Sequence, residues 1–235
     1  MKDQVVIIIG GSSGIGLSTA QLALKEGAQV TITGLHEEST AKALKQLPGA
    51  RGKALDVLSE EGIDSFLSKY ETIDHIYVAA GSTKLGGILE GGVDEQMIPI
   101  NLRLIGSVYL IRAAMPKMNN GGSIIFTGGL STDRPVAGAW VSGIGTAVAE
   151  QLARVMALEL APIRFNAISP GWTNTPMWDK VLGENKESVL EEVADSMLID
   201  RIVEADEVAN AVVFLMKNQA ITGEVLHVDG GGRLV

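Results

Sequence analysis

The seven residues GGSSGIG at positions 10–16 constrain the fold of this chain more than any other stretch. They follow an apolar run, Val5–Ile9, that is typical of a buried strand, and they lead into a helical pattern that ends at Gly27. Glycines in this context allow a sharp turn, a close approach of the backbone to a pyrophosphate, and tight packing of the helix against the sheet. The free N–H groups at the start of the helix favour a bound anion. The stretch therefore predicts a dinucleotide-binding loop.

Short apolar runs and longer helical segments alternate along the rest of the chain. We expect strands at 5–9, 29–33, 52–55, 76–79, 123–127, 164–168 and 225–228. We expect helices at 15–26, 37–47, 60–70, 94–118, 138–160, 186–199 and 206–217. Apolar strands separated by helices predict a parallel sheet that is covered on both faces. The predicted fold class is α/β: a single doubly wound Rossmann-type domain over residues 1–235, with about seven parallel strands and helices on both faces.

The composition argues against several classes of partner. The net charge is −9, from 19 basic and 28 acidic residues, and no block of basic residues occurs, so we expect neither a nucleic acid nor a membrane as partner. The first apolar run is too short for a signal peptide, and no apolar stretch is expected to span a membrane. The chain has no cysteine, which fits a cytoplasmic location. The histidines His36, His75 and His227 are scattered, so no metal site is expected.

The glycine stretch also matches the G-x-S-x-G pattern of serine hydrolases, with Ser12 as the nucleophile and His227 as a distant candidate base. This interpretation is the weaker one, because the nucleophile would follow the first strand and no earlier strand–helix loop could complete an oxyanion hole. A second S-G-I-G, at 142–145, repeats part of the loop. It is not expected to bind phosphate, because no strand ends just before it and it opens into a long helix.

Motifs farther along the chain extend the pattern. An aspartate and a valine follow the third strand at 56–57, VAAG stands at 78–81, and an asparagine occupies position 101 of a helix. The segment SPGWTNT covers 169–175, and the chain closes with ITG at 221–223 and VDGG at 228–231. With these motifs the chain, from Gln4 to about Gly231, resembles the short-chain dehydrogenase/reductase family.

The resemblance implies a bound nicotinamide dinucleotide. Its expected contacts are Gly10, Ser12, Ser13, Gly14, Ile15, Gly16, His36, Asp56, Val57, Ala80, Gly81, Thr127, Pro170, Gly171, Thr173 and Thr175. NADP is expected over NAD, because Gly34 stands where NAD-binding members of the family carry an aspartate. Ser12, Ser13 and His36 are expected to donate hydrogen bonds to the 2′-phosphate. Two glutamates at 37–38 are expected to face solvent at the start of the next helix.

The family's catalytic residues are missing. The resemblance assigns the family's tyrosine to Val141, its lysine to Gly145, and its serine to the glycines at 128–129. Valine and glycine side chains transfer no protons. The remaining catalytic candidates are Ser131, Asn101 and Arg134, with Asp133 and Ser142 nearby. Arg134 could bind an acidic substrate or stabilise an oxyanion, and the role expected for Asn101 is structural. The double substitution Val141→Tyr with Gly145→Lys is predicted to give some gain of carbonyl reduction.

Two functions remain open from the sequence. The first is an NADP-dependent oxidoreductase that acts on a small carbonyl, alcohol or related small-molecule substrate through a non-standard catalytic site. The second is a dinucleotide-binding sensor or assembly subunit that catalyses no reaction. The resemblance also implies a variable substrate loop around 176–200. It further implies a homodimer or homotetramer formed through the two long helices at 94–118 and 138–160.

Overall fold

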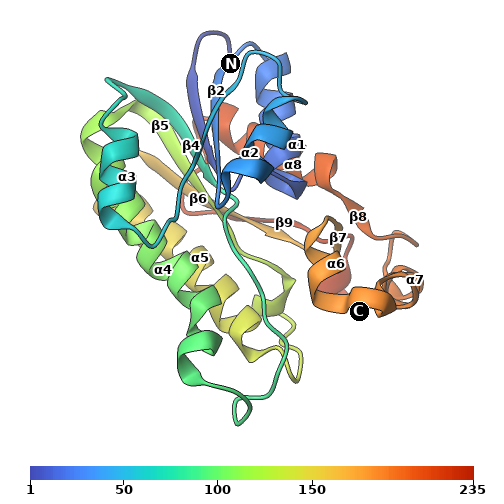
Figure 1. Cartoon of the computed structure of the whole chain (residues 1–235). Helices are drawn as coiled ribbons and strands as arrows, with labels where there is room; N and C mark the ends of the chain where they lie inside the picture. Colours follow the sequence, from blue (N-terminus) through green and yellow to red (C-terminus); the bar gives the residue numbers. More distant parts are fainter.

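A computed structural model describes all residues, 1–235. Its main sheet has seven parallel strands in the order β3-β2-β1-β4-β5-β6-β9 (Figure 1). The strands are β1 (Val5–Ile9), β2 (Gln29–Gly34), β3 (Arg51–Ala54), β4 (Ile73–Val78), β5 (Met118–Thr127), β6 (Arg164–Pro170) and β9 (Val225–Val228). The predicted α/β class with a doubly wound parallel sheet is confirmed.

Helices cover both faces of this sheet (Figure 1). One face carries α1 (Gly14–Lys25), α2 (Glu37–Leu44) and α8 (Ala205–Lys217), and the other carries α3 (Glu60–Leu67), α4 (Val93–Ala114) and α5 (Trp140–Glu159). The side chains of β1 alternate between the two layers. Val6 and Ile8 pack in the core on the α1 side, whereas Ile7 and Ile9 pack in the core on the α4 side. Burial on both faces explains why the strand is apolar throughout.

Several boundaries differ from the sequence prediction. The helix expected at 94–118 ends at Ala114 and continues as the 3-10 turn η1 (Met115–Lys117), because Pro116 lacks the N–H that a helix interior needs. Three unpredicted 3-10 turns are η2 (Leu130–Thr132), η3 (Gly183–Asn185) and η4 (Gly232–Leu234). The segment after β6 holds α6 (Met177–Leu182), α7 (Lys186–Ser196) and a small parallel pair, β7 (Thr173–Asn174) with β8 (Val203–Glu204). Of these elements, only a helix near α7 was predicted.

The strand order reverses between β1 and β4. The chain runs outward from β1 through β2 to β3, then returns to β4 on the other side of β1. Such a switch point opens a crevice at the carboxyl ends of the strands, where doubly wound folds bind ligands. Here the backbone N–H groups of Ala79 and Ala80 both donate to the carbonyl oxygen of Ile9 at 2.8 Å. These bonds hold the loops after β1 and β4 side by side.

The α4 segment stands out among the helices by its length and apolar composition. Val93–Lys117 is long and apolar enough to cross a membrane by length and composition, with a mean hydropathy of 1.2. In this fold α4 packs between α3 and α5, and Leu110, Ile111 and Ala114 enter the core. Ile98, Leu104 and Ile105 keep more than a third of their surface exposed. α4 is therefore apolar on both sides: one side packs in the core, and the other side is partly exposed.

The buried histidine of β4 gives a testable pH dependence. His75 is 3% exposed, and its Nδ1 lies 2.9 Å from the Ser123 hydroxyl. Burial, reinforced by the charge of Arg164, lowers the pKa of His75 from 6.5 to about 4. The unfolded chain therefore binds a proton below pH 6.5 that the folded chain does not accept until about pH 4.

We therefore expect the stability that depends on neutral His75 to be complete above pH 6.5 and to fall as the pH drops towards 4. The loss should reach about 2–3 kcal/mol at pH 4.5. Urea unfolding of the wild type and of a His75→Gln variant at pH 7 and pH 4.5 checks this. The variant should lose less free energy of unfolding between the two pH values. Equal losses in both proteins would contradict the prediction.

Candidate functional site

A cavity of about 530 Å³ lies at the carboxyl ends of the central strands, at the switch point. Its walls come from the loops after β1, β2, β3, β4, β5 and β6, together with residues of α4, α5 and α6. This volume falls within the range of small-molecule and cofactor sites in proteins. Its position matches the crevice that the strand order predicts.

The glycine loop after β1 leaves no room for side chains. Gly10 has φ +87°, and a Cβ at this position would lie 2.5 Å from the backbone nitrogen of Ala80. A Cβ on Gly16 would overlap the carbonyl oxygen of Gly10. Gly14, with φ +51°, lies against the side chain of Thr175, whose Cβ would be 3.2 Å from an added methyl group. The sequence therefore folds into a bare backbone cradle under the cavity.

The start of α1 is open to a ligand. Ser13 is the N-cap residue, but its side chain makes no capping hydrogen bond, and the first turn holds no acidic residue. The first N–H groups of the helix are thus left to an external acceptor, where the helix dipole favours negative charge. A bare cradle beside an uncapped helix start fits the pyrophosphate of a dinucleotide.

The cavity gathers nearly all the residues that the sequence predicted for the cofactor. Its lining includes Gly10, Ser12, Ser13, Gly14, Ile15, Gly16, Asp56, Val57, Ala80, Gly81, Thr127, Pro170, Gly171, Thr173 and Thr175. His36 is the exception. It is the N-cap residue of α2 and exposed, and its carbonyl oxygen accepts hydrogen bonds from the hydroxyls of Ser39 and Thr40. This turn leaves His36 outside the cavity lining, so its contact with the cofactor stays a prediction.

Position 34 is crowded by hydroxyl groups. A Cβ on Gly34 would lie 2.6 Å from Thr40 Oγ1 and 2.8 Å from Ser12 Oγ. An aspartate at this position would have to displace Ser12, which itself lines the cavity. Glu37 and Glu38 are exposed in the first turn of α2, as expected.

Two of the three catalytic candidates reach the cavity. Ser131 and Arg134 both line it, and Arg134 Nη1 also donates to the carbonyl oxygen of Gly232 at 2.9 Å. Asn101 does not line the cavity. Residues two apart on a helix point about 200° apart, and Arg103 reaches the cavity. The structure therefore gives no support to a catalytic role of Asn101, in keeping with the structural role expected for it.

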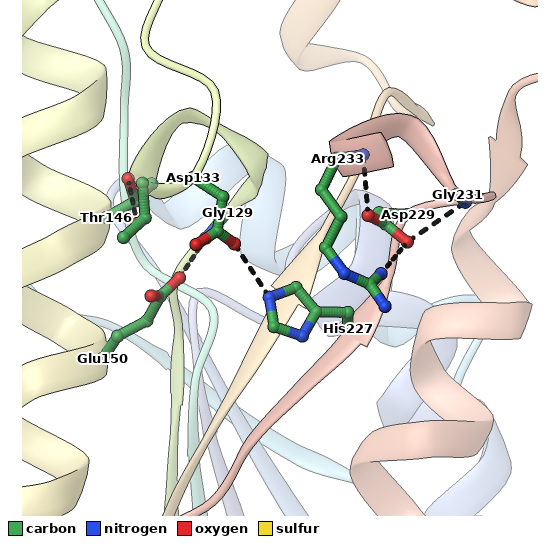
Figure 2. Close-up of polar contacts among 9 residues, drawn as sticks. Gly129, Asp133, Thr146, Glu150, His227, Asp229, Gly231 and Arg233 are labelled. Carbon is green, nitrogen blue, oxygen red and sulfur yellow. Dashed lines mark hydrogen bonds and ion pairs between the residues drawn. The ribbon is translucent and has the colours of Figure 1, made fainter. Parts of the chain in front are cut away.

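The hydrolase interpretation is also corrected. His227 Nε2 lies 2.9 Å from Asp133 Oδ2, and Figure 2 shows the two side chains facing each other. Ser12 follows β1, whereas His227 lies in β9, with β4, β5 and β6 between these strands. Four strand spacings amount to roughly 19 Å. Ser12 and His227 therefore cannot form a nucleophile–base pair, and Asp133 pairs with His227 outside the cavity lining.

Packing explains why glycines stand at positions 128 and 129, directly after β5. Glu150 of α5 is buried, and its Oε1 accepts a hydrogen bond from the Gly129 N–H at 3.1 Å (Figure 2). A Cβ on Gly128 would overlap this carboxylate. The place where the resemblance expects a serine is thus taken by Glu150 beneath the backbone. The hydroxyls of Thr83, Ser131 and Ser142 line the cavity nearby, and those of Thr83 and Ser142 contact each other.

A tyrosine that the sequence analysis did not assign also lines the cavity. Tyr77 of β4 is fully buried, and its hydroxyl accepts a hydrogen bond from Thr127 Oγ1 at 3.0 Å. Burial raises the pKa of the Tyr77 phenol. The group therefore stays protonated and is no base at neutral pH.

Arg103 of α4 is the site residue that sequence reasoning missed. It lines the cavity, and its Nη1 donates to the carbonyl oxygens of Ser82 at 2.8 Å and Pro99 at 3.3 Å. Burial lowers the pKa of the guanidinium from 12.5 to about 10, so it remains charged at neutral pH. A signal was present in IPINLRLIG, where one cation stands among apolar residues.

The two positions assigned to the family's tyrosine and lysine lie one turn apart on α5. Val141 is 2% exposed and does not line the cavity. Gly145 is buried, and a Cβ there would lie 3.3 Å from Nη1 of Arg103. The side of α5 that carries Gly145 is therefore covered by the arginine of α4.

A doubly wound parallel sheet with a bare glycine cradle at its switch point is the architecture of a dinucleotide-binding domain. Comparison with known proteins gives the family. The family model described as enoyl-(acyl carrier protein) reductase matches residues 10–232. The chain belongs to the short-chain dehydrogenase/reductase family.

Individual relatives span almost the whole chain. A short-chain dehydrogenase/reductase from Acremonium sp is 30% identical, with 98% of this chain and 96% of the relative covered. The 3-oxoacyl-[acyl-carrier-protein] reductase of Homo sapiens is 29% identical over 99% of each chain. Among solved structures, the MalC reductase/Diels-Alderase from Malbranchea aurantiaca has a TM-score of 0.92 at 27% identity, covering 100% of this chain and 98% of that one. A small-chain dehydrogenase in complex with NADPH has a TM-score of 0.87 at 27% identity, with both chains covered completely.

Proposed function

We propose that this protein is an NADP(H)-dependent oxidoreductase that acts on a small carbonyl, alcohol or related compound through a non-standard catalytic site. The observation that carries the proposal is the bare cradle formed by Gly10, Gly14 and Gly16, which opens into a cavity large enough for a cofactor and a small substrate. Membership of an oxidoreductase family whose solved members include NADPH complexes supports it.

Each group of residues has a distinct task in this proposal. The N–H groups at the start of α1 bind the pyrophosphate, and Asp56 and Val57 border the adenine. Gly81, Thr127 and the segment 170–175 border the nicotinamide half. A bound NADPH supplies the hydride. The chain must orient the substrate and stabilise charge on its oxygen, for which Ser131 and Arg134 line the cavity.

The preference for NADP over NAD can be tested at Gly34. In a Gly34→Asp variant the new carboxylate would repel a 2′-phosphate, and we expect the Kd for NADPH to rise at least about tenfold, with a smaller effect on NADH. Gly34→Asn is the matched control, since it has the same shape without the charge and meets the same hydroxyls of Ser12 and Thr40. If both variants raised the Kd for NADPH equally, steric crowding by the new side chain, and not its charge, would explain the weaker binding. Equal or tighter binding of NADH by the wild type would overturn the preference for NADP.

A non-catalytic sensor or assembly subunit is the second candidate function. The buried Val141 and Gly145, which offer no proton-transferring side chain, favour it. NADPH binding without turnover of a broad panel of carbonyl and enone compounds would support this alternative. Turnover that is lost in Ser131→Ala or Arg134→Ala variants would support the enzyme.

We further propose that the protein forms a homodimer or homotetramer through α4 and α5. The outer face of α4 keeps Ile98, Leu104 and Ile105 partly exposed, and Ile144 and Leu158 of α5 are exposed as well. Sedimentation as a monomer at micromolar concentration would contradict this. A cytoplasmic location remains part of the proposal, in keeping with the absence of cysteine.

A further inference from the structure

The guanidinium of Arg103 occupies a space between two glycines. A Cβ on Gly81 would lie 3.1 Å from Nη2 and 3.2 Å from Cζ of Arg103. A Cβ on Gly145, from the opposite side, would lie 3.3 Å from Nη1 and 3.5 Å from Cδ. Side chains at 81 and 145 would therefore crowd the arginine. The family's lysine position, 145 on α5, is a glycine in this chain. The guanidinium of Arg103, from α4, lies beside that position instead.

Only one edge of this guanidinium is used within the chain. Nη1 donates to the carbonyl oxygens of Ser82 and Pro99, which fixes the orientation of the group. Nη2 makes no hydrogen bond in the chain, and Nε is buried without a partner. Nη2 is therefore the nitrogen of this guanidinium that is left to donate to a ligand, since Nε is enclosed by the protein. Hydrogen bonds from a guanidinium to a carboxylate are charge-assisted and strong, which favours an anionic acceptor at Nη2.

The charges around the cavity point the same way. The cavity is lined by three basic side chains, Arg103, Arg134 and Lys180, and by one acidic side chain, Asp56. The chain as a whole carries a net charge of −9. Asp56 follows β3, at the adenine side, whereas Arg103, Arg134 and Lys180 come from α4, the β5–α5 connection and α6. A cavity whose charged side chains are mostly cations, in a protein of net negative charge, favours an anionic ligand.

We propose that Arg103 binds a carboxylate group of the substrate, so that the substrates of this protein are carbonyl compounds that carry a carboxylate. The inference rests on the proposed function only for the position of the nicotinamide, which lies beside Gly81. The carboxylate accepts a hydrogen bond from Nη2, while Nη1 keeps its bonds to the backbone. Arg103 is thus a specificity-determining residue and transfers no proton.

The test uses two probes of the same shape, benzoate and neutral benzamide. Each is titrated by calorimetry into the full-length protein, with and without saturating NADP⁺, in the wild type and in Arg103→Met and Arg103→Lys variants. Arg112→Met is the matched control, since Arg112 belongs to the same helix but is exposed and outside the cavity lining. NADPH binding and thermal unfolding of every variant are measured alongside.

We expect the wild type to bind benzoate at least about tenfold more tightly than benzamide, and Arg103→Met to lose this difference. Arg103→Lys should recover only part of it, because lysine restores the charge but lacks the planar group that the carbonyl oxygens of Ser82 and Pro99 hold in one orientation. Arg112→Met should match the wild type, and NADPH affinity should change less than about threefold in all variants.

Other outcomes overturn the inference. Equal binding of benzoate and benzamide by the folded wild type would do so. A full recovery in Arg103→Lys would show that a positive charge alone, without the oriented guanidinium, selects the anion. A large loss of NADPH affinity in Arg103→Met would make Arg103 a cofactor residue instead. The proposed function fails separately, if the wild type does not bind NADPH. In that case the benzoate and benzamide titrations without NADP⁺ still test the anion site, because they compare the affinities of the wild type and of Arg103→Met in the absence of cofactor.

Discussion

Replacing Gly10 with alanine is expected to abolish NADPH binding and to lower the free energy of unfolding by about 3 kcal/mol or more. Two penalties combine at this position. The backbone has φ +87°, which L residues rarely adopt, and the new Cβ would lie 2.5 Å from the backbone nitrogen of Ala80. Backbone atoms cannot swing aside as a flexible side chain does, so the loops after β1 and β4 would have to separate. Fluorescence titration with NADPH and urea unfolding measure the two effects.

Gly49→Ala provides the matched control. Gly49 has φ +91°, close to that of Gly10, but nothing lies within 4 Å of the added Cβ. This variant should show only the conformational penalty, about 1–2 kcal/mol, with NADPH affinity unchanged. If Gly10→Ala and Gly49→Ala were equally stable and both bound NADPH, the close approach of the two loops would not matter.

Restoring the family's acid–base pair should require removal of Arg103. The sequence alone predicted a gain of carbonyl reduction from Val141→Tyr with Gly145→Lys. In the structure, a side chain at 145 starts 3.3 Å from Nη1 of Arg103, so the new lysine would meet a second cation in the same space. We now expect the double variant to gain little, and the triple variant with Arg103→Ala to gain about 100-fold over it in kcat/KM for a neutral ketone.

Cyclohexanone suits this test, because it carries no carboxylate and does not depend on Arg103. Reduction is followed by the loss of NADPH absorbance, and NADPH binding is measured in each variant. Equal rates for the double and triple variants would show that Arg103 does not obstruct position 145. The single variant Arg103→Ala controls for a general opening of the cavity and should remain inactive on cyclohexanone.

The elements that local sequence signals specify could be predicted. The apolar run before the glycine loop and the glycines at 10, 14 and 16 belong to one short segment, and their roles follow from backbone geometry. The switch point follows from the strand order, which the sequence analysis did not predict. The structure adds that β1 and β4 are joined through Ile9, Ala79 and Ala80, a contact between residues about seventy positions apart.

The positions of the remaining site residues depend on packing between elements. Arg103 and Gly145 belong to different helices, and nothing in either segment shows that the two meet. Asn101 was chosen from the resemblance, but the rotation of α4 that brings Arg103 to the cavity turns Asn101 away. His36 lies only two residues after β2, yet the turn into α2 decides its direction. Sequence patterns identify the helices and strands, but they do not predict how each helix is rotated about its axis or in which direction a turn points a side chain.

The bond between Arg103 and Ser82 has a thermodynamic consequence. Nη1 of the guanidinium holds the loop after β4, and Nη2 has no partner in the chain. Any ligand that binds Nη2 also restrains the loop, and by reciprocity an ordered loop raises the affinity for that ligand. Ligand occupancy and loop mobility are thus two readouts of one equilibrium, and amide exchange in the loop reports on both.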